Sequence, residues 1–409
     1  MSFLKRILGI DDTDSREPYL RSYRWVMLAV IWLLYGVFGL TMRSIAPLVT
    51  PILRDLDMSF GEMGVILGSW QLVYIPVSIL AGIAMDKWGI RRTLFVGVVI
   101  LALSEGLRYF VGGFGSLLPI VALFGIGGPL ISVGAPKTIA VWFRDKGRAT
   151  AVSLYTTAPW LGGLFAIAAT NSVVMPWTGY SWRLTFVIYG LAALAVAVIW
   201  LVFSRDTRRT EDSQSASIKD VFFWLIRVRN VIIVLAAGLL DLLMEHGFSN
   251  WLPKMMESRG FSPEEAGFTA SIPLLAAIPS VLLIPQLTPR HLRGRVLSAL
   301  GFLAASALLI SYFSSSWLLQ GGLVLYGIAA PVMLPMLMLV LMDDPNVGPE
   351  HMGLAGGIFF GVAEIGGFIG PLLMGVLVDL TGNFLLGVSF LAGMGLLLSG
   401  LTLMLRIRK

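Results

Sequence analysis

The sequence predicts an all-α membrane protein with twelve transmembrane helices in two six-helix bundles and with both termini in the cytoplasm. Three observations predict this fold class: twelve long apolar segments, a one-sided distribution of Lys and Arg around them, and an internal repeat. An apolar run of about 20 residues is long enough to cross a hydrocarbon core of about 30 Å. The 409 residues are 56% hydrophobic and 13% charged, whereas soluble domains carry about 25% charged residues.

The apolar segments and the polar stretches between them divide the chain. The lead-in resembles no signal peptide, because its apolar stretch is short and lacks a small-residue cleavage site. The first apolar segment covers about 25–47 and the last about 384–405, and the longest internal polar stretch, SRDTRRTEDSQSASI, separates the first six from the last six. The predicted parts are a cytoplasmic lead-in (1–24), an N-terminal bundle (25–203), a cytoplasmic central loop (204–229), a C-terminal bundle (230–405) and a cytoplasmic tail (406–409).

The positive charges orient the helices. Most of the 30 Lys and Arg residues fall in the lead-in, in the loops after the second, fourth, sixth and eighth segments, and in the tail. The other side holds Arg54, Arg183, Lys254 and Arg259. The positive-inside rule therefore places both termini in the cytoplasm, although the cytoplasmic loop MDDPNVGPE is acidic. The net charge of +6 lies in membrane-flanking loops, so we expect the lipid bilayer, and no nucleic acid, as a partner.

Several classes of chemistry have no support in the sequence. There is no cysteine, which excludes disulfides, thiolate catalysis and thiolate metal sites. The three histidines, His246, His291 and His351, do not form a ligand cluster. Nothing resembles a nucleotide-binding loop, and no long tail or added domain supports a sensor. We therefore expect no enzyme activity, no cofactor and no metal.

An internal repeat relates the two halves. Four residues near the second segment recur near the eighth at one constant offset, and a Gly-Gly pair of the fifth segment recurs in the eleventh. The corresponding pairs are Ser59 and Ser262, Glu62 and Glu265, Gly64 and Gly267, Pro76 and Pro279, and Gly162-Gly163 and Gly366-Gly367. Parallel six-helix repeats are typical of transporters whose substrate site lies between the halves, near the bilayer midplane.

The loop after the second segment carries a family resemblance. It contains Gly82, Asp86, Lys87, Gly89, Arg91 and Arg92 in the order Gly, three residues, Asp, a basic residue, one residue, Gly, then basic residues. This pattern resembles the signature between helices 2 and 3 of the major facilitator superfamily. The resemblance covers essentially the whole chain and implies that family's fold, alternating access and a monomeric working unit. It also implies a conformational latch, in which Asp86 caps the N-terminus of the eleventh helix. Pro289 stands in the place of Asp86 in the second half, which argues against a second latch.

Two branches of that family share local patterns with the chain. The stretches from Thr41 to Pro47 and from Asn250 to Pro253 look like the cyanate-permease-like branch. Arg43 near the outer end of the first helix is also similar to the anion:cation symporter branch, where it implies a contact with a substrate carboxylate. The chain departs from that branch, because Met42 precedes the Arg where an acid is common and residues 125–129 contain no acid.

Ionisable residues inside apolar segments are the first candidates for a site, because a charge at the bilayer centre costs about 2.5–3.5 kcal/mol on insertion scales. Arg43 offers a fork that matches a carboxylate with two parallel hydrogen bonds. It could instead extend to water or pair with an acid of the seventh helix. His246 corresponds to Arg43 in the repeat. The predicted substrate-binding residues are Arg43, His246, Tyr35, Trp70, Tyr74, Trp160 and Asn250, and for the aromatic ones simple packing is the alternative.

The acids are candidates for proton coupling or gating. Asp241 and Glu245 are four residues apart and share one face of the seventh helix. They could carry a proton, or pair with Arg43 as an extracellular gate. Glu364 lies midway along the eleventh helix and could be a proton site or a buried neutral group. Glu105 and Arg108 are three residues apart, and we predict that they form a structural pair.

These residues predict a secondary active transporter of a small solute, with a small organic anion (a carboxylate) as the leading substrate class. Arg43 and His246 would bind the anion, and protons could be the coupling ion. The alternative is proton-coupled efflux of amphipathic or cationic compounds, held by Asp241, Glu245 and Glu364. Short loops and the lack of cysteine point to a prokaryotic inner membrane.

Overall fold

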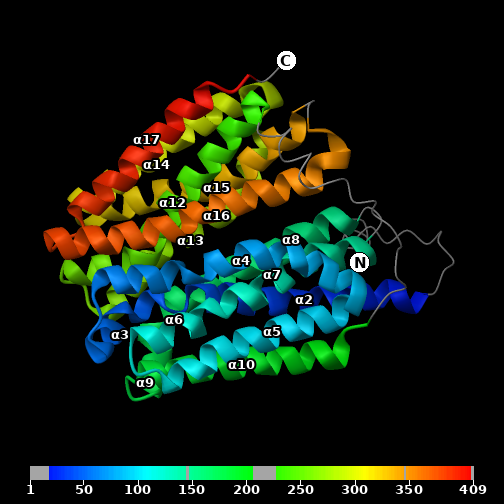
Figure 1. Ribbon diagram of the computed structural model, residues 1–409, viewed down its shortest axis with the longest axis horizontal. Helices are drawn as coiled ribbons and strands as arrows, with labels where there is room; N and C mark the ends of the chain where they lie inside the picture. The colour runs from blue at the N-terminus through cyan, green and yellow to red at the C-terminus, as the bar shows by residue number, and fades with distance from the viewer. Residues whose placement is uncertain (1–17, 144–146, 206–226, 345–346, 407–409) are drawn as a thin grey trace.

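The described residues fold into long α-helices joined by short connections (Figure 1). A computed structural model describes residues 18–143, 147–205, 227–344 and 347–406, and no β-strand occurs in these ranges. The helices of the N-terminal half are α2 (Pro18–Arg43), α3 (Val49–Leu56), α4 (Phe60–Trp88), α5 (Ile90–Gly106), α6 (Phe114–Ala122), α7 (Phe124–Trp142), α8 (Gly147–Ala169), α9 (Met175–Trp177) and α10 (Trp182–Phe203). Those of the C-terminal half are α12 (Arg229–Ser258), α13 (Pro263–Leu287), α14 (Arg293–Phe313), α15 (Ser316–Asp343), α16 (Gly348–Thr381) and α17 (Leu385–Leu403).

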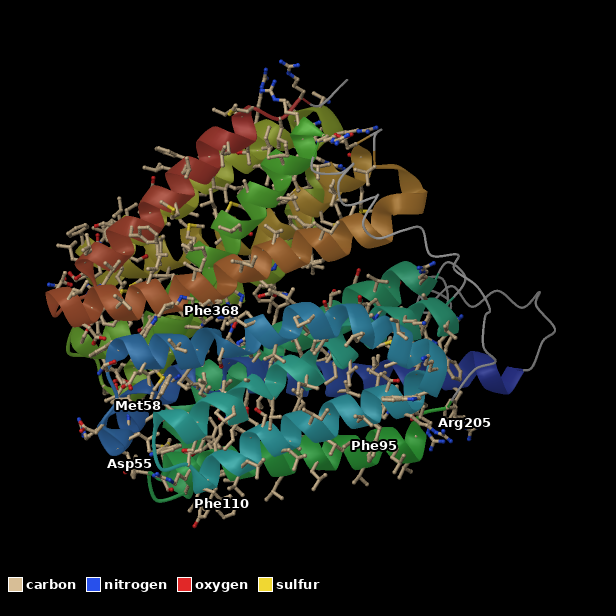
Figure 2. All side chains as sticks on the ribbon, viewed as in Figure 1. Asp55, Met58, Phe95, Phe110, Arg205 and Phe368 are labelled. Carbon is tan, nitrogen blue, oxygen red and sulfur yellow. The ribbon has the colours of Figure 1, made fainter. Side chains whose placement is uncertain are left out.

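The helices have the length and composition of membrane spans. Eleven helical segments of the described residues are long and apolar enough to cross a membrane. The remaining long helix, α4, has 29 residues and lies among them. Large apolar side chains such as Phe110, which is 78% exposed, project from the outer surface (Figure 2), where lipid would cover them. The prediction of an all-α membrane protein is confirmed.

The repeat seen in the sequence marks the same helix start in both halves. The Ser59 hydroxyl accepts a hydrogen bond from the Glu62 backbone N–H at 3.1 Å, and the Glu62 carboxylate accepts one from the Ser59 N–H at 2.9 Å. Ser262 and Glu265 repeat this reciprocal capping box at 3.2 and 2.9 Å. The two boxes begin α4 and α13, which are therefore equivalent helices of the two halves.

The halves meet through close contacts that also repeat. A Cβ atom built on Gly64 of α4 would lie 2.5 Å from the carbonyl oxygen of Pro371 in α16. One built on Gly267 of α13 would lie 2.6 Å from the carbonyl oxygen of Ile167 in α8. Both positions need glycine, because the backbones of two helices approach each other closely there. The interface between the halves thus has two equivalent seams, α4 with α16 and α13 with α8.

The halves are closed at the extracellular end and separate toward the cytoplasmic end. Along the α4–α16 seam, Gly68 of α4 lies against Phe368 of α16, which stands between the bundles in Figure 2. Further along the seam, a Cβ atom built on Gly361 of α16 would still lie 3.5 Å from the Ile75 side chain of α4. A Cβ on Gly82 or on Gly357, both further toward the cytoplasmic ends of these helices, would meet no atom within 4 Å. The ribbons diverge in the same direction (Figure 1). The structure is therefore inward-open.

A carboxylate of one half caps a helix of the other at the extracellular end. Asp379, at the end of α16, accepts hydrogen bonds from the backbone N–H groups of Phe60 and Gly61 at 3.0 and 2.7 Å. These N–H groups belong to the positive N-terminus of α4, which a carboxylate stabilises. Nothing in the sequence pattern around Asp379 predicts this contact.

The predicted cytoplasmic latch is only partly described. The side chain of Asp86 lies outside the described ones, so its expected contact is not tested. Gly89 separates α4 from α5 with φ of 85°, a conformation that favours glycine. Arg91 donates a hydrogen bond to the Ser204 hydroxyl at 3.2 Å, within its own half. Gly82 faces open space, while Lys87 and Arg92 are exposed.

Candidate functional site

A cavity of about 330 Å³ lies between the two halves, on the cytoplasmic side of the seams. Helices of both halves line it, so any molecule bound there contacts both. The lining residues are Tyr35, Phe38, Gly39, Met42, Arg43, Trp70, Tyr74, Ser132, Pro159, Trp160, Gly163, Asp241, Leu242, Glu245, His246, Leu274, Val281, Ala330, Pro331, Leu334, Pro335 and Glu364.

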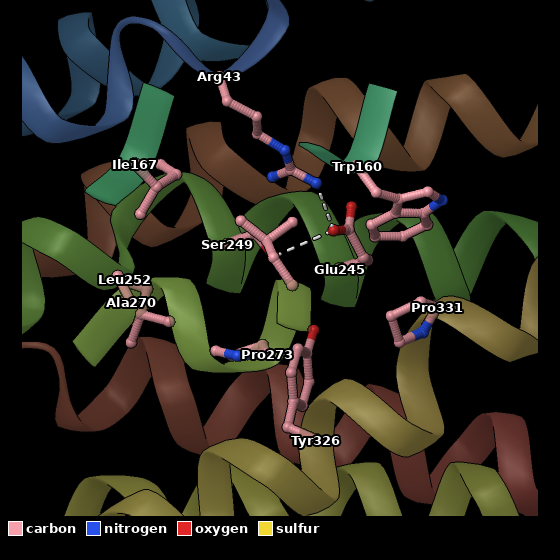
Figure 3. Close-up of a pocket in the computed structure, with 11 residues that line it drawn as sticks. Arg43, Trp160, Ile167, Glu245, Ser249, Leu252, Ala270, Pro273, Tyr326 and Pro331 are labelled. Carbon is pink, nitrogen blue, oxygen red and sulfur yellow. Dashed lines mark hydrogen bonds and ion pairs between the residues drawn. The ribbon is translucent and has the colours of Figure 1, made fainter. Parts of the chain in front are cut away.

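Arg43 and Glu245 form an ion pair across the halves. The Arg43 Nη2 atom lies 2.7 Å from Glu245 Oε1, and the Ser249 hydroxyl donates to the same oxygen at 3.0 Å (Figure 3). Arg43 ends α2 and Glu245 lies in α12. Their side chains are 8% and 14% exposed, and Trp160 stands beside them (Figure 3). The pair is thus largely shielded from water, yet it forms part of the cavity wall.

Polar and aromatic groups continue this contact between the halves. The Gln71 amide nitrogen of α4 lies 3.3 Å from His246 Nδ1 of α12 and donates to the Gly367 carbonyl of α16 at 3.2 Å. The ring of Trp70 meets His246 edge-on, with centroids 5.8 Å apart. His246 Nε2 in turn lies 3.5 Å from the second oxygen of Glu245. Of these groups, Trp70, Glu245 and His246 line the cavity, and they form its floor, the side that faces the extracellular end.

Asp241 and Glu364 are two further acids at the cavity. Asp241 lies one turn before Glu245 on α12, and Glu364 lies on α16. Asp241 Oδ1 and Glu364 Oε2 are buried, and neither finds a hydrogen-bond partner among the described residues. Buried polar atoms are nearly always hydrogen-bonded. These oxygens are therefore available to a proton, a substrate or a water molecule.

The aromatic candidates also lie at the cavity. Tyr35, Trp70, Tyr74 and Trp160 all line it. The Tyr74 hydroxyl lies 2.5 Å from the Ser132 hydroxyl, so these two groups satisfy each other. The Tyr35 ring packs against Phe38 with centroids 5.3 Å apart.

Asn250 is the one predicted substrate-binding residue that the structure does not bring to this cavity. It lies one turn beyond His246 on the same face of α12 and is therefore on the extracellular side of the floor to which Trp70 belongs. Its side chain lines a much smaller pocket of about 10 Å³, together with Arg108. The four-residue spacing alone could not show that His246 lines the cavity while Asn250 does not.

Glu105 and Arg108 form a buried network within the N-terminal half. Arg108 Nη1 lies 3.0 Å from Glu105 Oε1, and both side chains are at most 1% exposed. The Ser44 hydroxyl accepts from Arg108 at 2.9 Å and donates to Glu105 at 3.0 Å. The pair links helices of one half and does not line the central cavity.

Gln71 is one of the polar residues at the site that were not predicted from the sequence, together with Ser132 and Ser249. It is fully buried and touches two helices of the other half. A neutral polar residue inside an apolar helix, directly after Trp70, was the available signal. Within the described ranges, no group of three or more His, Asp and Glu residues could hold a metal ion.

The comparisons with known proteins identify the family. The profile of the Major Facilitator Superfamily matches residues 31–371 and, in a second match, residues 234–409. The chain belongs to this superfamily. It is therefore a multi-pass integral membrane protein that transports a small molecule and is not an enzyme.

Named relatives and solved structures support this assignment. The chain is 27% identical over 389 residues to the hexuronate transporter of Bacillus subtilis, covering 90% of this chain and 91% of that protein. It is 23% identical over 408 residues to the "Probable galactarate/D-glucarate transporter" of the same organism, covering 89% and 87%.

Two solved structures share the fold. A bacterial homologue of the human lysosomal transporter Spinster, in an inward-facing and occupied conformation, aligns with a TM-score of 0.68 at 19% identity and covers 93% of this chain and 91% of that chain. The fucose:proton symporter of E. coli aligns with a TM-score of 0.61 at 16% identity and covers 93% and 98%. At these identities the likeness concerns the fold alone, and it confirms the expectation of two six-helix bundles.

Proposed function

We propose that this protein is a proton-coupled symporter of a small organic anion and that Arg43 binds the carboxylate of the substrate. The observation that carries the proposal is the Arg43–Glu245 pair in the cavity between the halves. Glu245 already presents a carboxylate to the guanidinium at 2.7 Å. A substrate carboxylate that replaces it would find the same charge-assisted hydrogen bond.

The exchange supplies a route for coupling. When a substrate takes Arg43, Glu245 loses its cationic partner in a site that excludes most water. An unpaired carboxylate in such a place is costly, and taking up a proton removes that cost. Asp241 and Glu364 lie at the same cavity and could pass this proton to or from the cytoplasmic side.

The exchange also acts on the conformation. Arg43 and Glu245 belong to different halves, so their ion pair helps to hold the extracellular end closed. A ligand shifts a conformational equilibrium by its differential affinity for the two states. A substrate that breaks this pair lowers the stability of the inward-open state and favours rocking of the halves. Both walls of the cavity come from one chain, which supports a monomeric working unit.

The names of the relatives support an anionic substrate. Hexuronate, galactarate and D-glucarate are all carboxylates, and the transporters named for them match most of this chain.

One observation favours a second function, the efflux of organic cations. Among the described cavity residues three are acids, Asp241, Glu245 and Glu364, whereas Arg43 is the one Lys or Arg.

Uptake into proteoliposomes separates the two functions. The panel contains small carboxylates, other small anions and organic cations, each tested with and without an inward proton gradient, for wild type and Arg43→Gln. Empty liposomes correct for weak acids that cross lipid unaided. Anion uptake that rises with the gradient and is lost in Arg43→Gln supports the proposal. Exchange of cations against protons that survives in Arg43→Gln refutes it and assigns the site to the three acids.

A further inference from the structure

The charges at the cavity limit the number of carboxylates that a substrate can carry. Arg43 is the one Lys or Arg among the described cavity residues, and three acids share the same space. A substrate with two carboxylates would bring its second charge toward Asp241 or Glu364 without a cationic partner. While these acids are ionised, like charges in a site of low dielectric repel strongly. The cavity therefore matches one carboxylate.

The walls limit the polarity of the rest of the substrate. Beyond the floor, apolar side chains make up most of the lining, among them Phe38, Leu242, Leu274, Val281, Pro331 and Leu334. They belong to both halves and surround a cavity of about 330 Å³, which is within the range of small-ligand sites. Such walls stabilise an apolar body by removing it from water.

Few groups at the cavity remain for the hydroxyl groups of a substrate. The Tyr74 and Ser132 hydroxyls hydrogen-bond to each other, and His246 is engaged by Gln71. Asp241 and Glu364 offer acceptors, and the Tyr35 hydroxyl and the ring N–H groups of Trp70 and Trp160 offer donors, whereas a sugar acid carries hydroxyls all around its body. Each buried hydroxyl without a partner weakens binding. A polyhydroxylated acid therefore fits these walls poorly.

From these three observations we infer that the substrate is a monocarboxylate with an apolar body, aromatic or branched, and not a sugar acid or a dicarboxylate. This inference rests on the proposed function, because it requires Arg43 to bind a carboxylate. It separates this protein from its relatives named for hexuronate and galactarate or D-glucarate. Identities of 27% and 23% leave room for different cavity walls in the two relatives.

Calorimetric titration of the full-length protein in lipid nanodiscs tests the inference. The probes are phenylacetate, glucuronate, the dicarboxylate glucarate, the uncharged phenylacetamide and the lipophilic cation tetraphenylphosphonium. We expect phenylacetate to bind at least about tenfold more tightly than either sugar acid. Phenylacetamide should not bind to the wild type, and phenylacetate should not bind to Arg43→Gln.

A wall variant gives a second measurement. Val281→Thr adds a hydroxyl without changing the volume, so it should weaken phenylacetate binding and leave or improve glucuronate binding. Val324→Thr is the matched control, because Val324 is 39% exposed and does not line the cavity.

Two outcomes are distinguishable. If glucuronate or glucarate binds more tightly than phenylacetate and depends on Arg43, the inference about the substrate body is overturned and the proposed function stands. If no carboxylate binds but a lipophilic cation does, the proposed function fails as well.

Discussion

Glu245 occupies the place at Arg43 that the proposed mechanism gives to the substrate, so its removal should uncouple binding from protons. In Glu245→Gln the guanidinium loses its charged partner and no carboxylate competes for it. We expect tighter anion binding at neutral pH, with exchange across the membrane retained and proton-driven accumulation lost. Parallel measurements of counterflow and of gradient-driven uptake check this. Glu264→Gln, at the first turn of α13 outside the cavity, is the control.

The Glu105–Arg108 pair should affect stability and not transport. Removal of one partner of a buried ion pair leaves an uncompensated charge and costs about 3–5 kcal/mol, whereas replacement of both by apolar residues is often neutral. Arg108→Met should therefore lower the melting temperature markedly, and the double variant Glu105→Leu/Arg108→Met should recover most of the loss. A double variant that melts like wild type but no longer transports would contradict the structural role.

Among the site residues that the sequence revealed, the ionisable ones gave the clearest signal. Arg43, Asp241, Glu245 and Glu364 stand out because charged groups are rare inside apolar segments, and the structure brings all four to one cavity. Their pairing could not be derived from spacing, because Arg43 and Glu245 belong to different halves. Gln71 was missed because a neutral amide inside an apolar helix is a weaker signal than a charge.

At the level of helices, the sequence predicted the long spans and the repeat but not the local irregularities. The capping boxes of α4 and α13 are local patterns, so four residues suffice to find each. After α8, residues 170–174 form a π-helical turn. There the Asn171 amide donates to the carbonyls of Pro47 and Pro263 at 3.0 and 3.2 Å. Since these acceptors come from distant segments, only the folded chain shows why the helix deviates.

Asp379 should stabilise the closed extracellular end. Asp379→Asn removes the charge at the N-terminus of α4 and one of the two acceptors. Hydrogen bonds to charged groups contribute about 1.5–3 kcal/mol, so the population should shift measurably toward the outward-open state. The chain has no cysteine, which allows a single Leu252→Cys reporter in the pocket on the extracellular side of the Arg43–Glu245 pair.

We expect a membrane-impermeant maleimide to label this reporter faster from outside in Asp379→Asn than in wild type. Asp55→Asn is the control, because Asp55 pairs with Arg183 inside the N-terminal half. Equal labelling rates in all three proteins would show that Asp379 does not hold the halves together.

For the whole molecule, the sequence could predict two bundles and a site between them but not which end is open. Both conformations use the same helices and the same core within each half. The difference lies in contacts between the halves, such as Gly64 with Pro371 and Gly267 with Ile167. Both glycines belong to the repeat, but their positions in the sequence do not indicate that they contact the opposite half.

The Arg43–Glu245 pair has a consequence for the electrical behaviour of transport. If one substrate carboxylate replaces Glu245 and Glu245 takes one proton, each cycle moves one negative and one positive charge together. A membrane potential acts only on net charge, by about 2.3 kcal/mol per elementary charge per 100 mV. Uptake in proteoliposomes should then be unchanged by a valinomycin-imposed potassium diffusion potential.

Stimulation by an inside-negative voltage would instead require a second proton, and Asp241 or Glu364 would be its carrier. In the electroneutral case, the pH difference alone would set the accumulation of substrate, about tenfold for each pH unit. A cell with a collapsed voltage could then still import through this protein for as long as its exterior stayed more acidic than its cytoplasm.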